Sequence, residues 1–512
     1  MDNPVARALL RLTGVALVTV AVVAVVAPRQ PNISYDPRIV VPVLIVALAI
    51  GWFGRVPEVL KNRWMPIVVA TAGGGVATGL GLALRYDFGW DARVIFEMAR
   101  STHAGRRLTD GEYDYLSQFP NNIPLLVIDR FGVEVGAALG LAPDAVLITL
   151  TGVCVAVTLY AAHLLVMPVA GRGPALVTQL VILALVGTSP WVSVPYTDFY
   201  AMPFIVGGLA LATAAWRRPG WGARIVLGGL SIAAIAVAYV IKTTPAVVIV
   251  ALVVVAMVLL TDWSMGRARV LIASAAGAVV AFIVLSTALT AGAFAVTGLD
   301  SNRIEPQVSP PVVWWLASGM SEQVNAEGAA QYGTYRRDMV EAIRGRTPAE
   351  MREYAGTYIG DRWQERGPIG TLAFFANKAA WNWGDGMFWA WGEGLDSEPG
   401  RVMPHGPVAE AVNSVNGLHG SWYPIRTGFA QGLWLAVLLV AGFGLLRVPA
   451  RRETVILAVT VLGIAAFTLA FQGRSRYLFA FVPVVVSLAA VVRTRPDLGS
   501  VMEPVRRLVG GR

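Results

Sequence analysis

The sequence predicts an all-α polytopic membrane protein, a bundle of about 12 transmembrane helices with two large loops on one side. Of its 512 residues, 56% are hydrophobic and 14% are charged, whereas about 25% are charged in an average soluble chain. The runs at 270–288 and 454–471 contain no charge and approach the roughly 20 apolar residues that a membrane-crossing helix needs. Such helices satisfy their own backbone hydrogen bonds, as hydrocarbon requires.

The charge distribution supports this class. The formal net charge is +9, but the basic residues fall in short loops between apolar runs, which is the positive-inside pattern and does not indicate a nucleic-acid surface. Arg7 and Arg11 precede a long apolar run without a small-residue cleavage site, so a retained first span is expected and not a signal peptide. Cys154 is the one cysteine, which excludes disulfides within the chain and cysteine-based metal sites.

The expected organisation is one membrane domain in five consecutive parts. These are N-terminal spans (1–84), a first external loop with juxtamembrane helices (85–143), core spans (144–295), a second large external region (296–427), and C-terminal spans with a basic cytoplasmic tail (428–512). Spans are expected at about 9–28, 39–53, 65–84, 144–166, 174–189, 197–216, 225–240, 246–261, 270–295, 428–446, 453–471 and 477–492. Twelve crossings of the inner (plasma) membrane place both termini in the cytoplasm and both large loops outside.

One apolar segment of the first external loop is not expected to cross the membrane. Residues 123–141 carry Asp129, Arg130 and Glu134, and desolvating these charges in a span would be costly. The segment is therefore expected on the outer surface as an interfacial or re-entrant helix. Because the polar material gathers on one side, the functional site is expected there.

Two acidic residues near the outer ends of spans are the first candidates for function. Asp91 follows the third span and Asp198 begins the sixth, where a carboxylate needs a polar partner, water, a metal or a substrate. A carboxylate facing a cavity can accept a proton from an attacking hydroxyl, the role expected of Asp91. Asp198 could orient a sugar or help Asp91 hold a divalent cation, although the two show no metal-ligand spacing. Either acid could also simply bind loop amides.

Three cations are expected at the same boundary. Lys242 interrupts two apolar runs, and Arg474 and Arg476 occupy a very short outer turn, against the positive-inside bias. Arginine offers a planar fork to phosphate oxygens, while lysine acts as a point charge. The three side chains together could bind a lipid phosphate at headgroup depth, although Lys242 could also reach the lipid headgroups on its own.

The second external region contains an aromatic-rich segment, WNWGDGMFWAW at 381–391. Interfacial anchoring and stacking on a sugar ring or prenyl chain are both open, with Trp383 and Asp385 as candidate binding residues. The four histidines form no ligand pattern, and neither a nucleophile motif nor a phosphate-binding glycine loop is present in the sequence. A nucleotide-sugar donor is therefore not indicated.

Taken in order, these short motifs resemble those of the GT-C glycosyltransferases, and within them the bacterial protein mannosyltransferase and lipid A aminoarabinose transferase-like group (glycosyltransferase family 39-like). The motifs are FGWD at 88–91, FPNN at 119–122, SP at 189–190, YTD at 196–198, KTTP at 242–245 and RSRYL at 474–478. The resemblance implies a GT-C-type bundle, a polyprenyl-phosphate sugar donor and an extracytoplasmic site. It also implies Asp91 as catalytic base and a second functional acid at Asp198. The loop lacks the tandem acidic pair of that group, for which Asp87 could compensate.

The expected reaction is an inverting, metal-independent hexosyl or pentosyl transfer to a cell-envelope glycan, a glycolipid or a protein. No cofactor is certain, and a divalent cation is possible. Asp91 deprotonates the acceptor, while positioning and positive charge stabilise the departing phosphate. The expected substrate-binding residues are Asp87, Asn121, Asn122, Tyr196, Asp198, Lys242, Arg474, Arg476, Trp383 and Asp385.

Two other functions remain open. A secondary transporter or lipid flippase also has twelve spans with both termini inside, but it usually shows related halves and broken helices near the midplane, which the sequence does not show. A noncatalytic envelope scaffold would tolerate the loss of Asp91.

Overall fold

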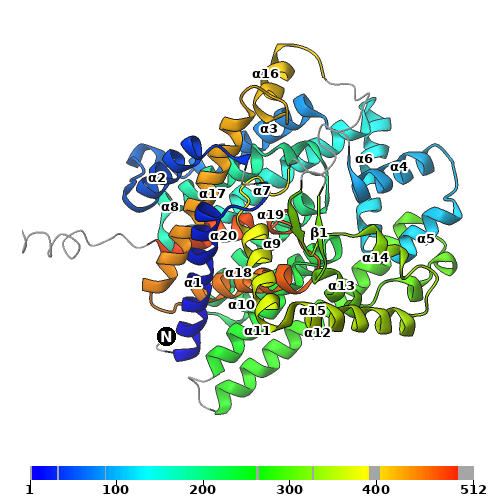
Figure 1. Cartoon of the computed structure of the whole chain (residues 1–512). Coiled ribbons are helices and arrows are strands. Elements are labelled where there is room, and N and C mark those ends of the chain that lie inside the picture. The colour runs from blue at the N-terminus through cyan, green and yellow to red at the C-terminus, as the bar shows by residue number, and fades with distance from the viewer. Residues whose placement is uncertain are drawn as a thin grey trace, which may run out of the picture.

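The computed structural model describes residues 3–31, 34–86, 88–260, 265–325, 328–390 and 404–493 (Figure 1). Among these residues, eight helices are long and apolar enough to cross a membrane: α1 (Pro4–Val26), α3 (Met65–Leu84), α7 (Pro143–Ala170), α9 (Thr197–Arg217), α10 (Trp221–Ile241), α12 (Met265–Thr297), α17 (Tyr423–Arg447) and α18 (Arg452–Ala470). Four shorter apolar helices are α2 (Pro37–Phe53), α8 (Arg172–Ile182), α11 (Ala246–Leu260) and α20 (Val482–Val492). The all-α polytopic class is confirmed, and each predicted span coincides with one of these apolar helices.

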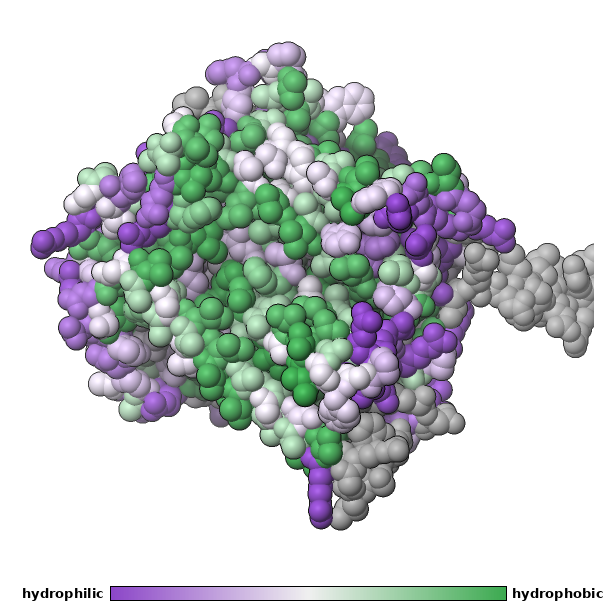
Figure 2. Space-filling view, turned by 180° about the vertical axis from the view of Figure 1, so that it is seen from behind, coloured by the Kyte–Doolittle hydropathy of each residue, from purple (hydrophilic) through white to green (hydrophobic). Residues whose placement is uncertain are grey.

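The surface carries an apolar zone suited to lipid. Figure 2 shows hydrophobic residues across the middle of one face of the molecule, with hydrophilic residues gathered at its two sides. Exposed side chains such as Val46, Val153 and Val280 come from helices that lie far apart in the sequence. A soluble monomer seldom exposes a contiguous apolar area larger than a few hundred Å², so lipid is the natural surrounding of these helices.

The helices α3 and α7 approach closely because glycines line their contact. A Cβ atom at Gly74 would lie 2.7 Å from the carbonyl oxygen of Gly152, and one at Gly152 would lie 2.0 Å from Thr78 Oγ1. Small residues let membrane helices come near enough for dense van der Waals contact. Since α3 ends at Leu84, this contact fixes the helix that leads into the first external loop.

The first external region forms a helical hairpin followed by a third helix. Its elements are α4 (Trp90–His103), α5 (Asp110–Gln118), η3 (Pro120–Asn122) and α6 (Ile123–Leu139). The helix α6, whose interfacial or re-entrant position stays a prediction, packs against α4 and α7.

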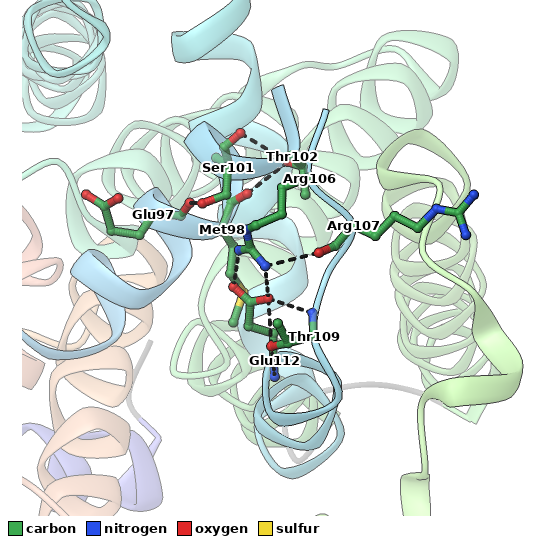
Figure 3. A network of polar contacts seen from close by, with 9 residues as sticks. Glu97, Met98, Ser101, Thr102, Arg106, Arg107, Thr109 and Glu112 are labelled. Atoms are coloured by element: carbon green, nitrogen blue, oxygen red, sulfur yellow. Dashed lines mark hydrogen bonds and ion pairs between the residues drawn. The ribbon is translucent and has the colours of Figure 1, made fainter. Parts of the chain in front are cut away.

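A polar network fixes the loop between α4 and α5. Figure 3 shows Arg106 and Glu112 facing each other across this loop, and Arg106 donates two hydrogen bonds of 2.9 and 2.6 Å to the carboxylate. Glu112 also accepts from the backbone N–H of Thr109, as part of a capping box at the start of α5. The hydrogen bond from Arg106 lowers the pKa of Glu112 to about 2, so the carboxylate stays charged. The network fixes this loop against the start of α5.

The second external region is also mainly helical. Its elements are η6 (Ser301–Arg303), η7 (Pro306–Val308), α13 (Val312–Gly319), β1 (Glu322–Val324), β2 (Ala330–Tyr332), α14 (Arg337–Glu341), α15 (Pro348–Trp383) and α16 (Pro407–Asn416). The two strands pair antiparallel, with Gln323 opposite Gln331. The helix α15 bends at Gly367, which takes a left-handed φ of 62° before Pro368. The short elements η2 (Glu58–Lys61), η4 (Leu183–Gly187), η5 (Pro190–Ser193) and α19 (Arg476–Phe479) join the apolar helices.

Loops predicted on one side of the membrane meet at one end of the molecule. At the end with the two external regions, Arg303 pairs with Asp110 at 2.5 Å. At the other end, where the inner loops are expected, Arg217 pairs with Glu453 at 3.1 Å, and Arg172 contacts the carbonyl of Lys61. The alternation of the predicted loops therefore agrees with the contacts, while the cytoplasmic orientation of the second end stays a prediction.

Candidate functional site

Asp91 lies in the first turn of α4, partly buried, and accepts hydrogen bonds from two tyrosines. The hydroxyl of Tyr115, from α5, lies 2.6 Å from Oδ1, and that of Tyr196, which precedes α9, lies 3.2 Å from Oδ2. Trp90, just before the acid, takes a left-handed φ of 47°, a conformation that is unfavourable for a non-glycine residue and is enriched at functional sites. The carboxylate is thus held at a strained turn by hydroxyls from two separate parts of the chain.

Both tyrosines are suited to remain hydrogen-bond donors. Burial raises the pKa of Tyr115 and that of Tyr196 well above the ordinary value, and the neighbouring charge of Asp91 raises both pKa values further. Their phenol groups therefore keep the proton throughout the physiological range. This leaves the other lone pairs of the Asp91 carboxylate, which has about four acceptor sites, for further donors.

The FPNN motif supports the first tyrosine. Asn122, which is buried, donates from Nδ2 to the hydroxyl oxygen of Tyr115 at 2.8 Å, and Asn121 donates to Asn122 Oδ1 at 3.3 Å. The two asparagines are therefore linked to Asp91 by hydrogen bonds through Tyr115. Tyr115 was not among the residues predicted from the sequence, although its position four residues before FPNN was an available signal.

Asp198 and Lys242 form a buried ion pair. Lys242 Nζ lies 2.9 Å from Asp198 Oδ1, and the exposed fractions of the two side chains are 10% and 5%. Asp198 lies in the first turn of α9, and Lys242 caps the end of α10. Because an unpaired buried charge is costly, the two residues depend on each other. The structure thus brings together two candidates that are 44 positions apart in the sequence.

The arginines of the 474–476 turn lie over aromatic rings. The guanidinium carbon of Arg476 is 5.2 Å from the ring centre of Tyr196 and 5.9 Å from that of Trp191. Arg474 lies 5.1 Å from the ring centre of Trp389. Such cation–π contacts hold a guanidinium in place. Since the ring of Tyr196 contacts Arg476 and its hydroxyl contacts Asp91, one side chain connects the candidate base with the cations.

Two candidates from the aromatic segment lie in the packed interior. Asp385 accepts hydrogen bonds from Ser475 Oγ at 2.7 Å, from Tyr35 OH at 3.2 Å and from two backbone N–H groups. Trp383 donates its indole N–H to Thr468 Oγ1 at 3.3 Å. Neither contacts Asp91, so we interpret both as supports of the 474–476 turn. Interfacial anchoring is wrong for Trp381, Trp383 and Trp389, whose exposed fractions are 2%, 3% and 4%.

Lys378 is a further support that the sequence did not reveal. Its buried ammonium donates to the carbonyl oxygens of Gly319, Leu469 and Phe471 at 2.6 to 2.8 Å. The last two belong to the end of α18, directly before the 474–476 turn. Burial lowers the pKa of Lys378 to about 7. The side chain ties the second external region to the end of a membrane helix.

Asp87, a predicted member of the site, lies outside the described residues, as does Trp391 at the end of the aromatic segment. Within the described part of the chain, no group of three or more His, Cys, Asp or Glu side chains could hold a metal ion. Asp91 and Asp198 each have the protein partners given above.

Residues 61–496 match a family described as conserved hypothetical integral membrane proteins. The chain belongs to this family. The match includes every candidate site residue from Asp87 to Arg476, so this family of integral membrane proteins is defined over the whole of the candidate site. It also runs from the loop before α3 to beyond the end of α20. No curated protein matches the sequence.

Two solved structures of the oligosaccharyltransferase of Archaeoglobus fulgidus are similar to this integral membrane protein. The enzyme AglB with an inhibitory peptide and a dolichol-phosphate has 12% identity and a TM-score of 0.39, and covers 88% of this chain and 52% of that chain. The apo form has 11% identity and a TM-score of 0.37, and covers 88% and 53%. The chain therefore spans about half the length of these structures.

Proposed function

We propose that this protein is a GT-C-type glycosyltransferase that transfers a sugar from a polyprenyl-phosphate donor to an acceptor hydroxyl. One observation carries the proposal: the side chain of Tyr196 contacts both the carboxylate of Asp91 and the guanidinium of Arg476. A proton acceptor and an arginine therefore lie one side chain apart, at the end of the molecule where the two external regions meet.

Asp91 is the proposed general base. Its oxygens retain acceptor capacity beside the two tyrosine hydroxyls, so an acceptor hydroxyl can donate to it. In the transfer, the acceptor oxygen attacks the anomeric carbon opposite the phosphate, the bond from that carbon to the phosphate oxygen breaks, and its electron pair leaves with the phosphate. The hydroxyl proton passes to Asp91, and the anomeric configuration inverts.

The cation cluster is the proposed phosphate site. Lys242, Arg474 and Arg476 carry three positive charges, and Lys242 is paired with Asp198. The two arginines suit the departing phosphate monoester, which carries about −1.5 to −2 near pH 7. Charge that develops on the departing phosphate is stabilised by cations that are already fixed over aromatic rings. The reaction as written needs no metal ion.

The remaining predictions complete the proposal. The transferred group is a hexose or a pentose, and the acceptor is a cell-envelope glycan, a glycolipid or a protein. The external regions face the extracytoplasmic side of the inner (plasma) membrane, with both termini in the cytoplasm. Asn121 and Asn122 act through Tyr115 on the position of the base.

The test is sugar transfer from radiolabelled polyprenyl-phosphate sugars in membranes that contain the native chain or Asp91→Asn. We expect the variant to lose about 10²- to 10⁴-fold in rate, the range typical of a general base. Asp114→Asn, an exposed acid of α5, is the matched control and should transfer at the native rate. Equal transfer by Asp91→Asn would remove this residue as the base. Substrate uptake into vesicles without transfer from any lipid-linked sugar would favour the transporter.

A further inference from the structure

A cavity lies at the end of the molecule opposite to Asp91. It has a volume of about 800 Å³ and lies among the ends of α2, α7, α17 and α20. Its lining includes one acidic residue, Glu58. Five basic residues also line it: Arg55, Lys61, Arg172, Arg451 and Arg493. Most other lining residues are apolar or small, among them Val56, Val169 and Val448. The cavity therefore favours an anion that also has apolar parts.

An apolar groove continues from this cavity between the membrane helices. It has a volume of about 560 Å³, runs between α2, α8, α17 and α20, and shares Pro174, Ala490 and Arg493 with the basic cavity. Along α8 and the start of η4 it extends from Pro174 to Ala184, about 15 Å at the rise of a helix. This is roughly half of the 30 Å hydrocarbon thickness of a bilayer, and thus the depth of one leaflet.

We infer that the basic cavity and the groove together bind one phospholipid with an anionic headgroup, from the leaflet opposite to the candidate catalytic site. The headgroup lies among the basic side chains and one acyl chain lies in the groove. Basic pockets between membrane helices are suited to anionic lipid headgroups. A free anion would use only the cavity, and a groove of this length holds one acyl chain but not a much longer polyprenyl chain.

The side chains of the cavity are arranged for this ligand. Arg493 donates to the carbonyl oxygens of Trp52 and Gly54 at 3.4 and 2.6 Å, which fixes its position at the junction of cavity and groove. The side chains of Arg55 and Arg451 form no hydrogen bond or ion pair within the described ranges, and both are exposed.

The N-terminal end of helix α18 also lies at this cavity. It begins after Arg451 without a side-chain cap, so its first backbone N–H groups are available to an anion. A phosphate group would satisfy these N–H groups and the two exposed arginines at once.

The experiment compares two lipids on the full-length, delipidated protein in detergent. Dioleoylphosphatidylglycerol is anionic, and dioleoylphosphatidylcholine has the same chains with a zwitterionic headgroup. Native mass spectrometry should show one phosphatidylglycerol retained per chain and no comparable retention of phosphatidylcholine. Thermal unfolding should show a higher Tm with phosphatidylglycerol than with phosphatidylcholine. Equal retention of the two lipids would overturn the proposal.

Three variants locate the site. The double variant Arg55→Gln/Arg451→Gln should lower the affinity for phosphatidylglycerol by about 25-fold, at roughly fivefold for each arginine near a headgroup. Ala47→Phe, which narrows the groove, should lower it as well. Arg218→Gln, at an exposed arginine after α9 outside the cavity, should bind as the native chain does. An unchanged affinity of the double variant, or an equal loss in Arg218→Gln, would contradict the site.

Discussion

Tyr196 connects the two chemical parts of the candidate site, and Tyr115 holds the base from the other side. The hydroxyl of each donates to one oxygen of Asp91, while the ring of Tyr196 also lies under Arg476. The two donors orient the carboxylate, and their raised pKa values keep both phenol groups protonated. We therefore interpret both tyrosines as positioning residues.

We expect Tyr115→Phe and Tyr196→Phe each to lower kcat by about 10- to 100-fold, since a hydrogen bond to a charged group contributes roughly 1.5 to 3 kcal/mol. The ring of Tyr196→Phe still covers Arg476, so the KM for the lipid donor should change little. Initial rates over a range of donor concentrations separate kcat from KM. Tyr160→Phe, on an exposed part of α7, is the control. Native rates in both variants would contradict the positioning role.

Single and double variants of the buried pair of Asp198 and Lys242 can distinguish a structural role of the pair from a functional one. We expect Asp198→Asn or Lys242→Met alone to destabilise the fold by about 3 to 5 kcal/mol, because each removes the ion-pair partner of a buried charge. The double variant should recover most of the loss in Tm. It should remain impaired in transfer, because Lys242, a cation of the proposed phosphate site, is absent. Thermal unfolding in detergent and transfer assays measure the two effects. Native transfer by the double variant would mean that the pair is only structural.

At the scale of elements, apolar length predicted the membrane helices well. The range 65–84 matches α3 at both ends, and the remaining spans differ from their helices by a few residues. Length and hydrophobicity suffice because the bilayer itself imposes them. Side-chain pairing is different, since the bond from Tyr115 to Asp91 depends on the angle between α4 and α5, which no periodic pattern encodes.

The aromatic segment shows where composition misleads. Its tryptophans suit a membrane interface, a sugar ring and a protein interior equally well, and only the contacts of Trp383 and Asp385 distinguish these environments. The sequence placed Asp91, Asp198, Lys242 and the arginines of the 474–476 turn on one side of the membrane. It could not show which of them touch, because their contacts join segments far apart in the chain.

The close contact of α3 with α7 offers a test at this scale. In Gly152→Val the new side chain would overlap Thr78 Oγ1 and the carbonyl of Gly74, so the helices must move apart. We expect a lower yield of monodisperse protein by size-exclusion chromatography, and lower transfer per folded molecule. Gly79→Val adds the same group to α3 where nothing lies within 4 Å, and should behave as the native chain. Normal yield and transfer in Gly152→Val would show that α3 is not held there.

At the scale of the whole molecule, the proposed donor requires the two external regions to face outward. Cys154 is the one cysteine, so Cys154→Ser gives a background for single-cysteine labelling. We expect a membrane-impermeant maleimide to label His419→Cys, on an exposed residue after α16, in intact cells. Arg218→Cys, at the opposite end, should be labelled only after permeabilisation. The reverse pattern would place Asp91 in the cytoplasm and contradict an extracytoplasmic reaction.

The helix α12 is longer than a bilayer requires. Its 33 residues extend about 50 Å, against roughly 30 Å of hydrocarbon, and its apolar window is only 6% buried. At its end, the carbonyl of Thr297 accepts a 2.5 Å hydrogen bond from Arg130 of α6, and α6 starts next to Asn122. A helix longer than the hydrocarbon can span it with some tilt, and we expect bilayer thickness to influence the tilt of α12. Through Arg130, a change of that tilt would reach the helix beside the residues proposed to orient Asp91, so we expect the proposed transfer to depend on the thickness of the bilayer.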